Sequence, residues 1–474
     1  MSRKVKRAIV FELSRLTEEQ KIILGYLTYH AGKLWNQANY LIKNKLAKPY
    51  YVDLYHTLKD TSIHLHSLQS RCAQIILDEL ARGWSNFFKF LDNPKKFKSK
   101  GIEIVRPPKY VNPEIPHRAV IWDKTGFKIE KSKIRLSLSK ELKKHLLVRF
   151  ALCAEYLWLD TGYEGLKELK VLNIQIVPYK SYGHLSYKLV VVYEKEVVEV
   201  KKKGSRALAI DYGVSNFATC VIEGNPVAYI IDGRGLKTLL WKKLKKIARL
   251  QSRLDNLKPK GLPTVQLERK LHKLWKSIKN LIRDYAHKVS NLIKELAIRN
   301  GVKVVVIGKV QASKNKESNL PDLVNQMFKL LPHGKVSQYL AYKLKEVGIE
   351  VRFVNEAYTS RTDSCEKTAT VREQNKGLGR RIKRGLFLSP VKGLINADIN
   401  GARNILRRFK KGWFDLVTGL KGVVRVRIYR FRGGISESLQ YAGIGVCGGV
   451  NPPRGIRVGI TYQTPSEAYD FRRR

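Results

Sequence analysis

The chain is long and strongly basic. It has 474 residues, with 91 Lys and Arg against 40 Asp and Glu, which gives a formal net charge of +51. This length predicts about two to four domains. So large an excess of positive charge indicates a polyanionic partner. Nucleic acid is favoured over a membrane surface because no apolar run approaches the length of a membrane span. Charge alone does not separate an enzyme from a ribosomal or chromatin protein.

The cysteines and the N-terminus indicate the compartment. No cysteine lies two to four residues from another, which excludes a CxxC zinc site and argues against a disulfide framework. We therefore expect reduced, structural cysteines. Residues 1–7 are basic and lead into a strand-like pattern, which is not that of a signal peptide, so we expect a soluble cytoplasmic protein. The five cysteines are Cys72, Cys153, Cys220, Cys365 and Cys447.

The N-terminal half combines strands with a block of helices. Residues 4–13 alternate as a strand does, and the sequence TEEQ at Thr17 is a helix N-terminal signal. Apolar residues then recur at helical spacing, so we predict a helical module over residues 17–91. Proline pairs, basic turns and short strands follow. We predict a small β-barrel or curled sheet made of residues 1–16 and 92–203, with the helical module inserted between its strands.

The C-terminal half alternates strands and helices. Residues 204–361 and 393–409 begin with a meander of three short apolar strands and continue with parallel strands and helices. This order is the RNase H-like plan. A helical hairpin (236–300) is inserted, and its Lys-rich face is either solvated or in contact with nucleic acid. Residues 362–392 form a basic insert, and 410–474 are predicted to be a basic, partly disordered tail. The predicted fold class is thus multidomain, α+β followed by α/β.

Three carboxylates stand at the ends of predicted core elements. Asp211 ends the first strand of the meander, Glu356 follows the strand 350–354, and Asp398 opens the last helix. A lone buried carboxylate is costly unless it is paired or binds a metal. The carboxyl ends of parallel strands meet at one edge of a sheet, so these side chains can converge. Mg²⁺ prefers oxygen ligands, and two such ions about 4 Å apart activate a water and stabilise the leaving 3′ oxygen in phosphodiester cleavage.

Each acid also has a plainer interpretation. Asp211 could begin an Asx turn, Asp398 could be a helix N-cap, and Glu356 could pair with a neighbouring base. Their joint placement at the right element ends of a basic chain favours a nuclease site.

Around these acids the chain resembles the TnpB family, the transposon-encoded RNA-guided nucleases related to type V CRISPR effectors. The resemblance covers the C-terminal half by motif. The N-terminal half is similar by architecture, as a wedge barrel with a helical recognition module and an RPPKY stretch. The matching motifs are AIDYGVSNFAT, DYAHKVSNLI, VVVIGK, VNEAYTSR and INADINGARNI.

The resemblance implies a function and its partners. It implies a RuvC-type nuclease domain, a guide RNA transcribed from the transposon end, and cleavage of guide-matched double-stranded DNA beside a short flanking motif with two Mg²⁺ ions. In this mode the protein reads the duplex shape and the short motif while base pairing reads the sequence. It places the protein at the prokaryotic nucleoid and not at a membrane, and leaves the oligomeric state unknown.

The chain departs from the family at the second acid. That acid usually follows the strand 302–307, where this chain has Gly308 and Lys309. One hypothesis is a nuclease-inactive, RNA-guided DNA-binding repressor. The other is that the acid has moved to the next strand, as in a branch of the family with an E-x-Y-T-S setting, which Glu356 matches. We favour the second, so the predicted catalytic and metal ligands are Asp211, Glu356 and Asp398.

A second departure concerns zinc. The family usually carries four zinc-binding cysteines between its second and third acids, and only Cys365 remains here, so we predict no zinc. The basic insert in their place is expected to contact nucleic acid or to close over the site. The predicted nucleic-acid contacts are Lys109, Tyr110, Arg361, Arg380, Arg381, Lys383 and Arg384.

Overall fold

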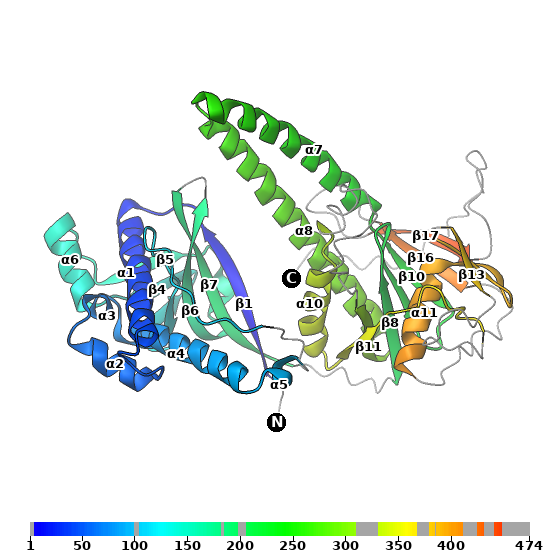
Figure 1. The fold of residues 1–474 in the computed structure, drawn as a ribbon, viewed down its shortest axis with the longest axis horizontal. Coiled ribbons are helices and arrows are strands. Elements are labelled where there is room, and N and C mark those ends of the chain that lie inside the picture. Colours follow the sequence, from blue (N-terminus) through cyan, green and yellow to red (C-terminus); the bar gives the residue numbers. More distant parts are fainter. Residues whose placement is uncertain are drawn as a thin grey trace. The chain divides into compact units, whose positions relative to one another are not determined.

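The computed structural model divides the chain into two compact units, Met1–Val197 and Val198–Arg474. Figure 1 shows the helices and strands of each. None of the helices in the described ranges is long and apolar enough to cross a membrane. The described residues are 4–98, 104–181, 184–197, 205–309, 330–366, 379–383, 385–410, 424–430 and 440–447.

The first unit contains two antiparallel sheets. One has the strand order β1-β7-β6-β2 and the other β3-β4-β5. In the described residues β1 and β2 are the opposite edges of the first sheet and do not pair with each other. The strands are β1 (Lys4–Leu13), β2 (Val120–Asp123), β3 (Phe127–Glu130), β4 (Lys133–Ser137), β5 (Tyr156–Asp160), β6 (Lys170–Ser181) and β7 (His184–Glu196).

The helices of this unit share one apolar core with its sheets. The long helix α1 begins at a capping box in which Thr17 and Gln20 exchange hydrogen bonds, and this confirms the helix start predicted from TEEQ. Buried side chains of α1 and α4 belong to the same core as Trp122 and Leu189 of the first sheet. The helices are α1 (Glu18–Lys43), α2 (Tyr51–Lys59), α3 (Ile63–His66), α4 (Ser70–Asp92), α5 (Pro94–Lys98), α6 (Lys140–Phe150) and the short η1 (Glu164–Leu166).

The second unit is built on a seven-stranded sheet with the order β12-β11-β8-β9-β10-β16-β17. Strands β8, β9 and β10 form an antiparallel meander, and β11 and β12 add in parallel beyond β8. These strands are β8 (Arg206–Tyr212), β9 (Asn216–Ile222), β10 (Val227–Asp232), β11 (Val302–Lys309), β12 (Glu350–Asn355), β16 (Val424–Arg430) and β17 (Gln440–Cys447).

Helices cover both faces of this sheet. Apolar side chains of one face, among them Leu208 and Ile307, pack with α7, α8 and α10. The opposite face, with Ala209 and Val306, packs with α11, and Figure 1 shows α11 and α8 on the two sides of β8. The helices are α7 (Arg234–Leu257), η2 (Lys258–Lys260), α8 (Val265–Arg299), α10 (His333–Lys345) and α11 (Ala397–Phe409).

Two segments contain strands that the sequence did not predict. The predicted tail, 410–474, contains β16 and β17, which extend the main sheet. The sequence prediction of a partly disordered tail did not include these strands, although the alternation in VRVRIYR is typical of a strand. The predicted insert, 362–392, contributes to a small sheet of β13 (Arg380–Lys383), β14 (Leu386–Ser389) and β15 (Gly393–Asn396).

Candidate functional site

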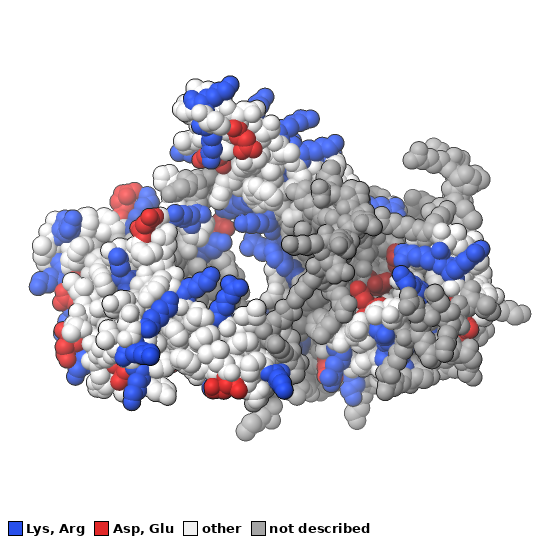
Figure 2. Space-filling view, viewed as in Figure 1, with Lys and Arg blue, Asp and Glu red and all other residues white. Residues whose placement is uncertain are grey.

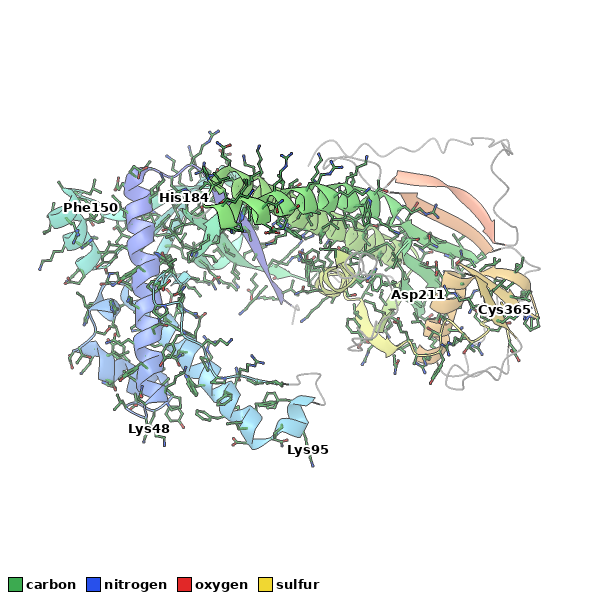
Figure 3. The ribbon with its side chains drawn as sticks, turned by 45° about the horizontal axis from the view of Figure 1, so that its top comes forward. Lys48, Lys95, Phe150, His184, Asp211 and Cys365 are labelled. Atoms are coloured by element: carbon green, nitrogen blue, oxygen red, sulfur yellow. The ribbon has the colours of Figure 1, made fainter. Side chains whose placement is uncertain are left out.

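Asp211 lies near the end of β8 on the face covered by α11. Ala207 and Ala209 pack against α11, and side chains two residues apart on a strand share a face. Removal from water and the negative charges of Asp398 and Glu356 raise the pKa of Asp211 well above its usual range, while the Arg381 guanidinium acts in the opposite direction. The other two predicted acids and one predicted base therefore lie within electrostatic reach of Asp211. Figure 3 labels Asp211 beside α11.

Asp398 lies in the first turn of α11 with its carboxylate available to the site. The N-cap is Asn396, whose Oδ1 accepts from the backbone N–H of Asp398 at 2.9 Å and of Ile399 at 3.2 Å. The alternative role of Asp398 as N-cap is thus wrong. Its Oδ2 instead accepts a 2.7 Å hydrogen bond from Nδ2 of Asn216, at the start of β9. Asn216 therefore orients this carboxylate.

Glu356 follows β12 by one residue and folds back toward the middle of the sheet. A Cβ atom placed on Gly308 of β11 would lie 2.7 Å from Glu356 Oε2, so the carboxylate lies directly over that glycine. Strand β11 separates β12 from β8. The carboxylate thus reaches over the intervening strand toward Asp211. Burial raises the pKa of Glu356.

The loop that carries Glu356 is held by asparagines of α11. The buried side chain of Asn404 donates to Thr359 O at 2.8 Å and Thr362 O at 2.7 Å, and Asn400 donates to Thr362 O at 2.8 Å. Thr359 in turn donates from its backbone N–H and its hydroxyl to Glu356 O, at 3.1 and 2.8 Å. The repeated asparagines of INADINGARNI are therefore loop anchors.

Sequence reasoning overlooked the residues that shape the site. These are Asn216, Gly308, Gly401 and Asn404. A Cβ atom on Gly401 of α11 would overlap Asp211 Oδ2, so this glycine lets the helix approach the carboxylate. The spacing of two asparagines four residues apart on one helix face was a readable signal; the two glycines become informative only once the sheet register is known.

The carboxylates suit oxygen-seeking ions. Thr219 pairs with Asp211 across β8 and β9, and its buried hydroxyl has no hydrogen-bond partner in the described part of the chain. No three His, Cys, Asp or Glu side chains among the described residues are gathered tightly enough to hold one ion together. Mg²⁺ is usually held by one or two carboxylates plus substrate phosphates and waters, so acids spread around a central aspartate fit that mode of binding.

The predicted nucleic-acid contacts fall into separate groups. Arg380 and Arg381 are exposed on β13, and Arg361 is exposed in the loop after Glu356. Of these, Arg381 is the one whose charge acts on Asp211. Lys383 ends β13, with a side chain outside the described set, and Arg384 lies outside the described residues altogether.

Lys109 and Tyr110 belong to the first unit. Trp35 Nε1 donates to Lys109 O at 2.9 Å, which fixes the RPPKY segment against α1. The Lys109 side chain is exposed, and 41% of Tyr110 is exposed, with the Lys43 ammonium 4.0 Å from its ring centroid. An exposed aromatic ring with two lysines can stack on a base and neutralise phosphate.

Cys365 lies in a packed environment. It is 3% exposed, and burial raises the pKa of its thiol. Arg403 Nη1 lies 3.7 Å from its Sγ, and Figure 3 labels Cys365 near the small sheet. The nearby strand β14 buries Phe387 completely.

Comparison with known proteins identifies the class. The family model OrfB_IS605, described as "Probable transposase", matches residues 190–314, and "Cas12f1-like, TNB domain" matches residues 333–405. The solved structure described as "Cryo-EM structure of the Cas12f1-sgRNA-target DNA complex" superposes with a TM-score of 0.52 at 15% identity, over 85% of this chain and 98% of that one. The protein therefore has a mixed helix and sheet multidomain fold similar to that of the Cas12 effectors.

Two curated relatives narrow the class to a family. The chain is 24% identical over 390 residues to "TnpB-like protein ORF457" of Acidianus two-tailed virus, over 80% of this chain and 81% of the relative. It is 30% identical over 224 residues to "Putative RNA-guided DNA endonuclease InsQ" of Escherichia coli (strain K12), over 45% of this chain and 51% of the relative. The chain is thus similar to TnpB proteins over most of its length, and its second unit matches the two family models.

Proposed function

We propose that the protein is a transposon-associated, RNA-guided DNA endonuclease that cleaves guide-matched DNA beside a short flanking motif. The observation that carries this proposal is the convergence of Asp211, Glu356 and Asp398 from two strand ends and one helix start. The negative charges of Asp398 and Glu356 both act on the Asp211 carboxylate. Similarity to TnpB proteins supports it, as does the similarity to a relative named as a putative RNA-guided DNA endonuclease. The site is the active centre of a RuvC-type, RNase H-like domain.

The chain's own residues divide the work of phosphodiester hydrolysis. Two Mg²⁺ ions held by the three carboxylates would activate the attacking water and stabilise the leaving 3′ oxygen. Asp211 is central, because both other acids act on it. Asn216 fixes the orientation of Asp398, and the Thr359 contacts fix the start of the Glu356 loop. The Arg381 guanidinium, whose charge acts on Asp211, would contact a phosphate near the carboxylates and so hold the scissile strand there.

Guide RNA and double-stranded DNA are the proposed partners. A net charge of +51 suits many phosphate contacts. Lys109 and Tyr110 provide one exposed basic and aromatic surface, and the α7–α8 hairpin provides another. Helix α7 carries eight Lys or Arg and a single acid, and Figure 2 shows Lys and Arg side chains along that hairpin. Such a protein acts in the prokaryotic cytoplasm, at the nucleoid.

A nuclease-inactive, RNA-guided repressor is the second candidate. The presence of Lys309 where the family usually has an acid favours it. The position of Glu356 argues for the nuclease, because a carboxylate does reach the site from the neighbouring strand. The two candidates share a guide and a target and differ only in whether the DNA is cut.

Sequencing the RNA that copurifies with the protein tests the proposal first. We expect one abundant RNA species whose variable end can be reprogrammed. With that RNA, double-stranded DNA that carries the match behind a randomised flank should be cut in Mg²⁺ or Mn²⁺ and not in EDTA. Absence of cleavage with every flanking sequence would refute the nuclease proposal. Guide-directed DNA binding without cleavage would support the nuclease-inactive repressor instead.

A further inference from the structure

Gly308 lies between two of the proposed catalytic acids. Ile307 pairs with Ile210, which places Gly308 beside Asp211, and Gly308 itself pairs with Val354, two residues before Glu356. The residues Val304, Val306 and Val354 all pack on the α11 side of the sheet. Because side chains alternate along a strand, position 308 faces that same side, where both acids lie.

The Glu356 carboxylate occupies the space that a side chain at position 308 would take. A Cβ atom on Gly308 would lie 2.7 Å from Glu356 Oε2 and 2.9 Å from Ile405 Cδ1. Real Cβ contacts essentially never fall below 3.0 Å, so at least the carboxylate would have to move. The Ile405 atom is the far end of a flexible side chain and can rotate away.

Backbone conformation does not require glycine at this position. Gly308 is not among the glycines with positive φ in the described residues, so an L-amino acid could adopt its backbone geometry without strain. The reason for glycine at position 308 is therefore the space that it leaves above β11.

We infer that Gly308 is a positioning residue whose missing side chain lets the Glu356 carboxylate cross β11 and reach Asp211. This inference rests on the proposed nuclease function. It also implies that a carboxylate attached at position 308 could take the place of the Glu356 carboxylate. Glu356 Oε2 now lies 2.7 Å from the position that a Cβ atom of residue 308 would take. The carboxylate oxygens of an aspartate at position 308 would lie at a similar distance from that Cβ atom.

A double-mutant cycle in thermal unfolding tests the contact without any measurement of activity. In the full-length protein, Gly308→Ala should lower the unfolding midpoint by about 3 °C through overpacking. In a Glu356→Ala background the same change should cost clearly less, because the clashing carboxylate is gone. Gly334→Ala is the matched control, since a Cβ atom there meets nothing within 4 Å. Equal costs of Gly308→Ala in the two backgrounds would overturn the inference.

Cleavage by the guide-loaded protein tests the positioning. Gly308→Ala should slow cleavage by about 100-fold and leave guide-directed DNA binding unchanged, because a displacement of the order of an ångström misplaces the acid. The double change Glu356→Ala with Gly308→Asp should regain at least about tenfold over Glu356→Ala alone.

The outcomes separate this inference from the proposed function. Full cleavage activity of Gly308→Ala would overturn the positioning role of Gly308. If Glu356→Ala with Gly308→Asp cleaves no faster than Glu356→Ala alone, a carboxylate at position 308 does not replace that of Glu356. If the wild-type protein does not cleave at all, the nuclease proposal fails, and the unfolding cycle alone decides whether Gly308 makes room for Glu356.

Discussion

Removal of the Asn404 side chain should cost both stability and activity. Asn404 is 0% exposed, and its amide donates to Thr359 O and Thr362 O at 2.8 and 2.7 Å. Asn404→Ala breaks both hydrogen bonds. It leaves the buried Thr359 O unpaired, at a cost of about 1–3 kcal/mol, whereas Thr362 O keeps the hydrogen bond from Asn400, so that the second lost bond costs about 0.5–1.5 kcal/mol. The free energy of unfolding should therefore fall by about 2–4 kcal/mol. The Glu356 carboxylate should also lose its fixed position, because Thr359 anchors the start of that loop.

Urea unfolding and cleavage rates measure the two effects separately. The urea midpoint should fall with an unchanged slope, and cleavage should slow by at least about tenfold under conditions where the variant is folded. Ser62→Ala in the first unit is the control, since Ser62 is 2% exposed and its hydroxyl makes two hydrogen bonds. That variant should lose stability but keep its cleavage rate. If Asn404→Ala loses the expected stability and still cleaves at the wild-type rate, the anchoring argument is refuted.

Four other experiments test separate parts of the molecule. Gly401→Ala, whose Cβ would overlap the Asp211 carboxylate, should reduce cleavage by about 100-fold. Cleavage at the wild-type rate would show that α11 can shift to make room for the added methyl group. Burial and two neighbouring histidines lower the pKa of His30 to about 4, so the fold holds it neutral. Its contribution to stability is complete above about pH 6.5 and is lost as the pH falls toward 4; in His30→Phe the urea midpoint should depend less on pH over this window. Metal analysis should find no zinc, and prolonged chelation should leave the unfolding midpoint unchanged. Stoichiometric zinc would contradict the prediction that the insert 362–392 replaces a zinc site. Reversal of two exposed charges of α7, Lys242→Glu with Lys246→Glu, should weaken nucleic-acid binding and reduce its logarithmic salt slope by about 2, whereas an unchanged slope would show a merely solvated face.

The elements that carry the site could be predicted from local sequence. The TEEQ cap, the apolar periodicity of α7 and α8 and the short apolar runs of the meander are signals that each segment contains in itself. A strand-end carboxylate such as Asp211 is also visible locally, because a charged residue after an apolar run needs a partner.

The features that could not be predicted depend on contacts between distant segments. The position of Glu356 over Gly308 follows from the register of β11 with β12 and β8, which no single segment specifies. The N-cap of α11 is Asn396 and not Asp398, and these two residues compete for one role within three positions. Strands β16 and β17 were overlooked because β16 pairs with β10, which is far away in sequence, and β17 pairs in turn with β16.

The proposed role of Glu356 is tested most directly by measuring binding and cutting by the same variant. Wild-type protein and Glu356→Ala are each loaded with the copurifying RNA and given matched DNA in Mg²⁺, and occupancy and cleavage are followed together. We predict equal occupancy and a loss of cleavage by more than about 100-fold in the variant, since metal ligands matter more than the outer contacts that cost 10–100-fold. Cleavage at the wild-type rate by Glu356→Ala would contradict the proposed site.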